Sequence, residues 1–158
     1  AKEAFNTGIF ILCVHADADQ IDDSHVFNYK IIPAIKSIQK NPDGICKIIV
    51  PIVPITMSES WMLADKELFK SEIGTTLSDE TLNINRPPEL MANPKALIEN
   101  ALRIAQESLP GRRFKLTIGE LYQPIGQKIS IEKLNSLNSF KKFKAAIEVA
   151  FKELNYLR

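Results

Sequence analysis

Residues 8–17 read GIFILCVHAD and residues 45–55 read ICKIIVPIVPI, and these two apolar stretches decide the fold. A short apolar run bounded by turn residues is typical of a strand buried on both faces of a parallel sheet. Between the two runs, residues 26–39 repeat apolar side chains at helical spacing, and residues 41–44 (NPDG) form a turn. The order strand, helix, strand predicts a parallel βαβ unit.

Prolines set the expected limits of these elements. Pro33 interrupts the helical run, so we expect a kink or a second helix that starts there. Pro51 and Pro54 have no N–H to donate to a ladder, so regular pairing of the second strand is expected to stop near Val50.

Further helices are expected downstream, and they complete the fold class. The patterns predict helices over residues 58–68, from residue 94 to the turn at 109–111, after a Ser130 cap and after a Ser139 cap. Residues 74–93 are expected to form a loop and residues 112–129 a connector. We therefore expect residues 1–158 to form a single α/β domain with a mainly parallel sheet flanked by helices and a helical C-terminal part.

Composition and missing motifs exclude several classes of protein. The 158 residues suffice for one domain, and no apolar run approaches the roughly 20 residues that span a bilayer, so no membrane association is expected. The sequence has no Gly-rich phosphate loop, no GxSxG elbow and no HExxH motif. Cys13 and Cys46 lie in apolar runs and are expected to be buried free thiols. Because no secretory signal precedes them, we expect a cytoplasmic protein.

Charge is distributed unevenly along the chain. Residues 112–158 hold ten Lys/Arg and four Asp/Glu, whereas residues 1–111 hold ten Lys/Arg and fifteen Asp/Glu. A basic C-terminal segment suits contact with a polyanion. The candidate phosphate-binding residues are Arg112, Arg113, Lys141, Lys142 and Lys144. The alternative is a solvated basic face on a helix that is there mainly to pack.

Three carboxylates form the candidate site. Asp17 and Asp19 follow the first buried strand directly, and ligands of parallel α/β sheets bind outside the carboxyl ends of strands. At spacing i, i+2 their oxygens can face one hard cation such as Mg²⁺. Glu59 follows the neighbouring strand, which would bring its carboxylate near the same end. The alternatives are solvated loop carboxylates and, for Glu59, a favourable position at a helix N-terminus.

Four stretches of the chain resemble a Toprim-like domain family of unknown function, found in bacterial defence loci beside OLD- or ABC-type ATPases. They are Asp17-Ala18-Asp19 after its strand, the strand followed by residues 59–65 (ESWMLAD), Pro88-Glu89 with residues 93–95 (NPK), and residues 121–130 (LYQPIGQKIS) with 139–143 (SFKKF). The resemblance covers nearly the whole chain.

The resemblance implies a Toprim-like fold and a nuclease that cleaves DNA or RNA with Mg²⁺ or Mn²⁺, in anti-phage defence. Asp17, Asp19 and Glu59 would then be catalytic residues and metal ligands. The alternative is a non-catalytic interaction partner of the neighbouring ATPase. Toprim domains also use a Glu after their first strand. Because the chain lacks an initiator Met and enters a core strand at once, we expect the natural protein to extend upstream by about 30 residues, a strand and a helix.

Overall fold

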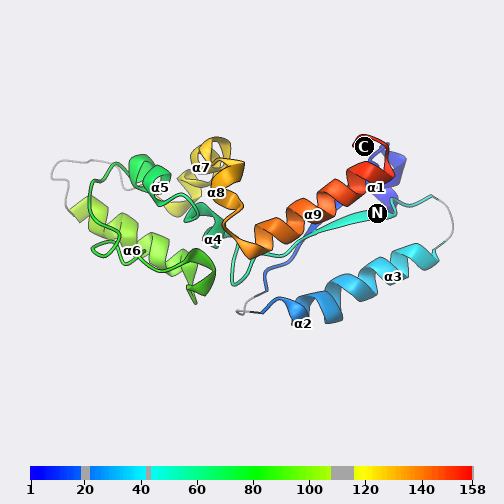
Figure 1. Cartoon of the computed structure of the whole chain (residues 1–158), viewed down its shortest axis with the longest axis horizontal. Coiled ribbons are helices and arrows are strands. Elements are labelled where there is room, and N and C mark those ends of the chain that lie inside the picture. The colour runs from blue at the N-terminus through cyan, green and yellow to red at the C-terminus, as the bar shows by residue number, and fades with distance from the viewer. Residues whose placement is uncertain (19–21, 42–43, 108–115, 158) are drawn as a thin grey trace.

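The computed structural model describes residues 1–18, 22–41, 44–107 and 116–157. Within them the chain is mixed α/β, with two parallel strands flanked by helices (Figure 1). Strand β1 (Ile11–His15) pairs with β2 (Ile48–Ile52) from Ile11 opposite Ile48 to His15 opposite Ile52. The expected α/β class and the parallel pairing are confirmed, and the sheet of the described residues has two strands.

Helices make up most of the remaining structure. In chain order they are α1 (Lys2–Asn6), α2 (Ser24–Val26), the π-helix η1 (Phe27–Ile31), α3 (Ile32–Lys40), α4 (Glu59–Met62), α5 (Lys66–Ile73), the 3₁₀ turn η2 (Pro88–Leu90), α6 (Pro94–Glu107), the 3₁₀ turn η3 (Ile118–Glu120), α7 (Tyr122–Lys128), α8 (Ile131–Leu134) and α9 (Asn138–Glu153). Figure 1 shows α9 alongside the strands and α4 to α8 gathered at one end of the molecule. The C-terminal part is helical, as expected.

Pro51 lies inside β2, which corrects the expectation that pairing stops near Val50. It stands opposite Val14 in the register. Ala16 N donates to Ile52 O, so Ile52 turns its backbone polar groups toward β1 and its neighbour Pro51 turns them away. The missing N–H of Pro51 therefore costs no ladder bond.

Pro33 is the second residue of α3, so a helix begins within one residue of it, which is one of the two expected outcomes. Proline has no N–H for the carbonyl four residues earlier in a helix. A π-helical turn, η1, lies directly before α3. As a result, α2, η1 and α3 follow one another without a gap.

Two of the expectations about helices were wrong. The helix expected over residues 58–68 is split, since Asp65 caps α5 by accepting from Leu68 N at 3.1 Å. The expected connector contains the helix α7. Its Pro124 and Gly126 have low helix propensity, so the sequence pattern did not predict a helix there. Ser130 caps α8 as expected, by accepting from Lys133 N.

The start of α9 also differs from the expectation. Glu89 caps this helix: its Oε2 accepts from Asn138 N and its Oε1 from Ser139 N, each at 2.8 Å. The Ser139 hydroxyl instead accepts from Trp61 Nε1 at 2.8 Å. A carboxylate from a distant loop therefore has the role that the sequence assigned to Ser139.

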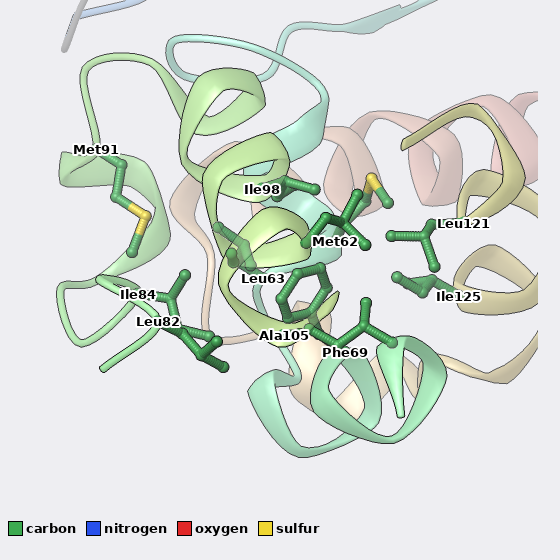
Figure 2. Packing of buried hydrophobic residues seen from close by; sticks show 13 residues of the cluster. Met62, Leu63, Phe69, Leu82, Ile84, Met91, Ile98, Ala105, Leu121 and Ile125 are labelled. Atoms are coloured by element: carbon green, nitrogen blue, oxygen red, sulfur yellow. The ribbon is translucent and has the colours of Figure 1, made fainter. Parts of the chain in front are cut away.

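The larger hydrophobic core lies among the helices rather than on the sheet (Figure 2). Its buried members are Met62, Leu63, Phe69, Ile73, Leu82, Ile84, Met91, Ile98, Ala101, Leu102, Ala105, Leu121 and Ile125. A smaller cluster beside the strands consists of Ala18, Val26, Ile31 and Val53. Because the larger core includes Met62 and Leu121, it fixes both α4 and the entry to α7, the two elements that reach the candidate site.

The two cysteines differ in exposure. Cys46 is buried as expected, but Cys13 is exposed, which corrects the expectation of two buried thiols. Side chains alternate between the faces of a strand, and Cys13 shares its face of β1 with the exposed His15. The expectation assumed a sheet covered on both faces.

Among the helices of the described residues, none has the length and apolar character needed to cross a membrane.

Candidate metal centre

Asp17 lies just beyond the carboxyl end of β1. Ala16 N donates to Ile52 O and Ala18 N to Pro54 O, so the chain around Asp17 continues alongside the segment that follows β2. Asp17 Oδ1 accepts from Ser58 N at 3.1 Å and lies 3.3 Å from His15 Nε2. The continued pairing of the two segments is what brings Asp17 to the start of α4.

A strained turn leads from β2 to Glu59. Thr56 is buried and has φ 64°, a left-handed conformation that β-branched residues rarely adopt. Its hydroxyl donates to Ile55 O at 2.6 Å, and Ser60 Oγ donates to the same carbonyl at 3.4 Å. Strained backbone of this kind concentrates at functional sites. Here it turns the chain so that Glu59 follows within a few residues of the strand end.

Glu59 is only 7% exposed, and both of its carboxylate oxygens accept hydrogen bonds. Tyr122 Oη donates to Oε1 at 2.7 Å, and Ser58 Oγ donates to Oε2 at 3.3 Å. Since Ser58 N also donates to Asp17, this serine joins the two predicted site residues. Asp17 therefore contacts the residue that directly precedes Glu59.

The region around Tyr122 is acidic. The pKa of the Tyr122 hydroxyl is raised to about 12, first by burial and then by the hydrogen bond to Glu59. The negative charges of Glu59, Glu99 and Asp17 raise it further. Three carboxylates from three segments of the chain therefore act on one phenol. No chemical pattern in the sequence pointed to Tyr122 or Glu99, because both reach the site only through helix packing.

The chemistry of these donors fits Mg²⁺. Magnesium is a hard cation that is commonly held by one or two carboxylates, while water and substrate phosphates fill its remaining positions. Asp17 and Glu59 supply two carboxylates. Within the described part of the chain no group of three or more His, Cys, Asp or Glu side chains is arranged to hold a metal ion. Asp19, the third predicted ligand, lies outside the described residues.

The predicted phosphate-binding residues have different surroundings. Lys142 Nζ donates to both oxygens of the buried Asp23, at 2.9 and 2.6 Å. Lys144 Nζ lies 3.9 Å from Glu148, and Lys141 is exposed on α9. Arg112 and Arg113 lie outside the described residues. Lys142 thus has an intramolecular partner that the sequence did not indicate.

A cavity of about 580 Å³ lies between the η1 region and α9. Asp23, Phe27, Lys142 and Phe143 contribute to its lining, whereas Asp17 and Glu59 do not. Its volume is within the range of ligand pockets. Asp17 and Glu59 therefore do not belong to the wall of this cavity.

Comparisons of the chain with family models, curated proteins and solved structures returned no significant match.

Proposed function

We propose that this protein is a divalent-metal-dependent nuclease of Toprim type that acts on DNA or RNA in anti-phage defence. The single observation that carries the proposal is the joining of Asp17 and Glu59 through Ser58 at the carboxyl ends of two parallel strands. Ligand sites of parallel α/β proteins lie at this edge. The resemblance of the ESWMLAD stretch and of the C-terminal segments to Toprim-like domains supports the same reading.

In this proposal the chain's carboxylates bind Mg²⁺ or Mn²⁺. Asp17 and Asp19 hold the ion, and Glu59 either holds it or orients a water molecule. When bound, such an ion activates water as a nucleophile and stabilises charge that develops on a phosphate. The burial of Glu59 strengthens its interaction with a cation, because charges interact more strongly away from bulk water.

The nucleic acid is proposed to lie against the basic C-terminal segment, where Arg112, Arg113, Lys141, Lys142 and Lys144 are the candidate phosphate contacts. Lys141 offers its ammonium to solvent, and Lys144 is partly exposed. Each phosphate contact that is formed makes affinity fall with salt. Because Lys142 pairs with Asp23, charge reversal there would also disturb the fold, so binding is best tested with Lys141→Glu and Lys144→Glu.

Metal binding is tested by thermal unfolding of the protein with Mn²⁺ or Mg²⁺. At a metal concentration about 100 times Kd, binding stabilises the native state by about 2.7 kcal/mol, which raises Tm by about 5–10 °C in a chain of this size. Asp17→Asn and Glu59→Gln are each expected to remove most of this shift.

Asp22→Asn is the matched control. Asp22 is an exposed acid in the same loop, and its carboxylate accepts from Ser24 rather than from the site. This variant should keep the metal response of the wild type. Cleavage of DNA and RNA substrates, measured in parallel, should require the metal and be lost in Glu59→Gln. A wild-type Tm that does not respond up to roughly 10 mM metal would reject the metal-nuclease proposal.

Exposed apolar side chains favour a second candidate function, a non-catalytic Toprim-like partner of an OLD- or ABC-type ATPase. Phe10 is 65% exposed and Ile9 47%, both just before β1, and Tyr29 on η1 is 72% exposed. Exposed apolar groups of this kind are found at protein–protein interfaces. This function predicts unchanged ATPase binding in Glu59→Gln, whereas Phe10→Ser should weaken that binding in a pull-down with the neighbouring ATPase.

A further inference from the structure

We infer that Tyr122 is a positioning residue of the proposed metal centre: its hydroxyl holds Glu59 Oε1 and leaves Oε2, which accepts only a long bond from Ser58, for the cation. The inference rests on the proposed metal-dependent function. It names a residue from the distant C-terminal part of the chain, 63 positions from Glu59.

The two oxygens of Glu59 are held unequally. The bond from Tyr122 to Oε1 is 2.7 Å long, the usual length for a hydroxyl donor. The bond from Ser58 Oγ to Oε2, at 3.3 Å, is longer than the usual range for such donors. Oε2 is therefore the weakly held oxygen. A cation that takes Oε2 displaces a weak bond and leaves the strong one in place.

Ser58 donates a hydrogen bond to each of the two carboxylates. Ser58 donates through its hydroxyl to Glu59 Oε2 and through its backbone N–H to Asp17 Oδ1. Both acceptor oxygens therefore lie within hydrogen-bond distance of Ser58. Tyr122 bonds the other oxygen, Oε1, so it restrains the carboxylate while Oε2 keeps only its long bond from Ser58.

The backbone of Tyr122 is held in place by buried residues before and after it in the chain. Its hydroxyl is therefore kept next to Glu59. Leu121 and Ile125 are each 1% exposed and belong to the larger core, together with Met62 of α4 (Figure 2). The same core therefore fixes the donor and the helix that begins with the acceptor. Side chains that orient a metal ligand from outside typically change metal affinity by 10- to 100-fold when removed.

The experiment measures the Kd for Mn²⁺ from the free-ion signal in electron paramagnetic resonance, well below the unfolding temperature. Tyr122→Phe removes only the hydroxyl and is expected to raise Kd by about 10- to 100-fold. Ser58→Ala removes only the weak bond to Oε2 and is expected to leave Kd unchanged or to lower it. Tyr156→Phe, at a residue 71% exposed, is the matched control and should bind like the wild type.

The outcomes separate the inference from the function on which it rests. Wild-type binding with weakened binding in Tyr122→Phe alone supports the positioning role. Wild-type binding with an unchanged Kd in Tyr122→Phe overturns it, even if the metal-free Tm of that variant falls, because a purely structural hydroxyl changes stability without changing Kd. Equal weakening in Tyr122→Phe and Ser58→Ala also overturns the assignment of Oε2. A wild type that binds no Mn²⁺ rejects the proposed function and the inference together.

Discussion

At the scale of single residues, Thr56 shows how the turn before Glu59 is held. A residue with a Cβ in the left-handed region costs about 1–2 kcal/mol relative to a right-handed conformation. Thr56 is buried, and its hydroxyl bonds Ile55 O. The surrounding structure therefore keeps an unfavourable backbone angle immediately before the candidate site.

At most positions an alanine variant is more stable than a glycine variant, and at Thr56 we expect the opposite order of stability. We expect Thr56→Gly to be more stable than Thr56→Ala by about 1–2 kcal/mol, because glycine adopts a positive φ without a steric cost. Urea unfolding of the two variants measures the difference. The same pair at Thr75, which is not among the residues with positive φ, should show alanine equal to or more stable than glycine. Alanine as the more stable replacement at position 56 would contradict the left-handed turn.

Some of the site was predictable residue by residue. Asp17 and Glu59 follow apolar strands directly, and parallel pairing brings the ends of such strands together. Tyr122 was not predictable, because its contact with Glu59 depends on how α7 packs against α4. Only the resemblance of its stretch to Toprim-like domains drew attention to that segment.

At the scale of elements, the N-terminus of α9 depends on a residue from another part of the chain. Both oxygens of Glu89 accept from the first backbone N–H groups of this helix, which would otherwise have no intrahelical partner. A negative charge there also interacts favourably with the helix dipole. Glu89 lies in η2, so the loop that precedes α6 is joined to the last helix.

Removal of this cap should cost measurable stability. Glu89→Ala is expected to lower the free energy of unfolding by about 0.5–2 kcal/mol, as for other helix caps. Chemical denaturation provides the measurement, with Glu80→Ala, at an exposed acid in the loop after α5, as the matched control. If both variants lose the same stability, the cap contributes nothing specific.

Element boundaries divide into those that local chemistry fixes and those that it does not. Pro94 at the start of α6 and Ser130 before α8 are local signals, and both predictions were confirmed. The split between α4 and α5 and the start of α9 depend on which of several competing polar residues acts as cap. Asp65 and Glu89 have that role in the folded chain, and spacing alone did not identify either one.

At the scale of the whole molecule, one ion pair joins the segment after β1 to the last helix. Asp23 and Lys142 are 119 residues apart, and the Asp23 side chain is 6% exposed while that of Lys142 is 55% exposed. Lys142 Nζ also lies 6.0 Å from the centre of the Phe27 ring. This contact connects α9 with the α2–η1 region across the cavity described above.

Loss of the lysine should leave a buried carboxylate without its cation. We expect Lys142→Met to lower stability by about 1–3 kcal/mol, less than for a fully buried pair, because the ammonium is partly solvated. Lys141→Met, one position along on the exposed side, should have little effect. Asp23→Asn combined with Lys142→Met should recover much of the loss. Thermal unfolding of the wild type, Lys141→Met, Lys142→Met, Asp23→Asn and the double variant measures it. Additive losses in the double variant would show that the two residues do not depend on each other.

The exposed Cys13 gives the molecule a natural attachment point for a spectroscopic probe. Cys46 is shielded, and its Sγ donates to Phe10 O at 3.2 Å, so a thiol-reactive label should enter the folded chain at Cys13 alone. Asp17 lies four positions after Cys13, about 13 Å along an extended strand. Mn²⁺ is paramagnetic, and a nitroxide or fluorophore on Cys13 would therefore sense the ion at short range. The wild-type sequence therefore needs no added cysteine to carry a label that reports where a metal ion binds.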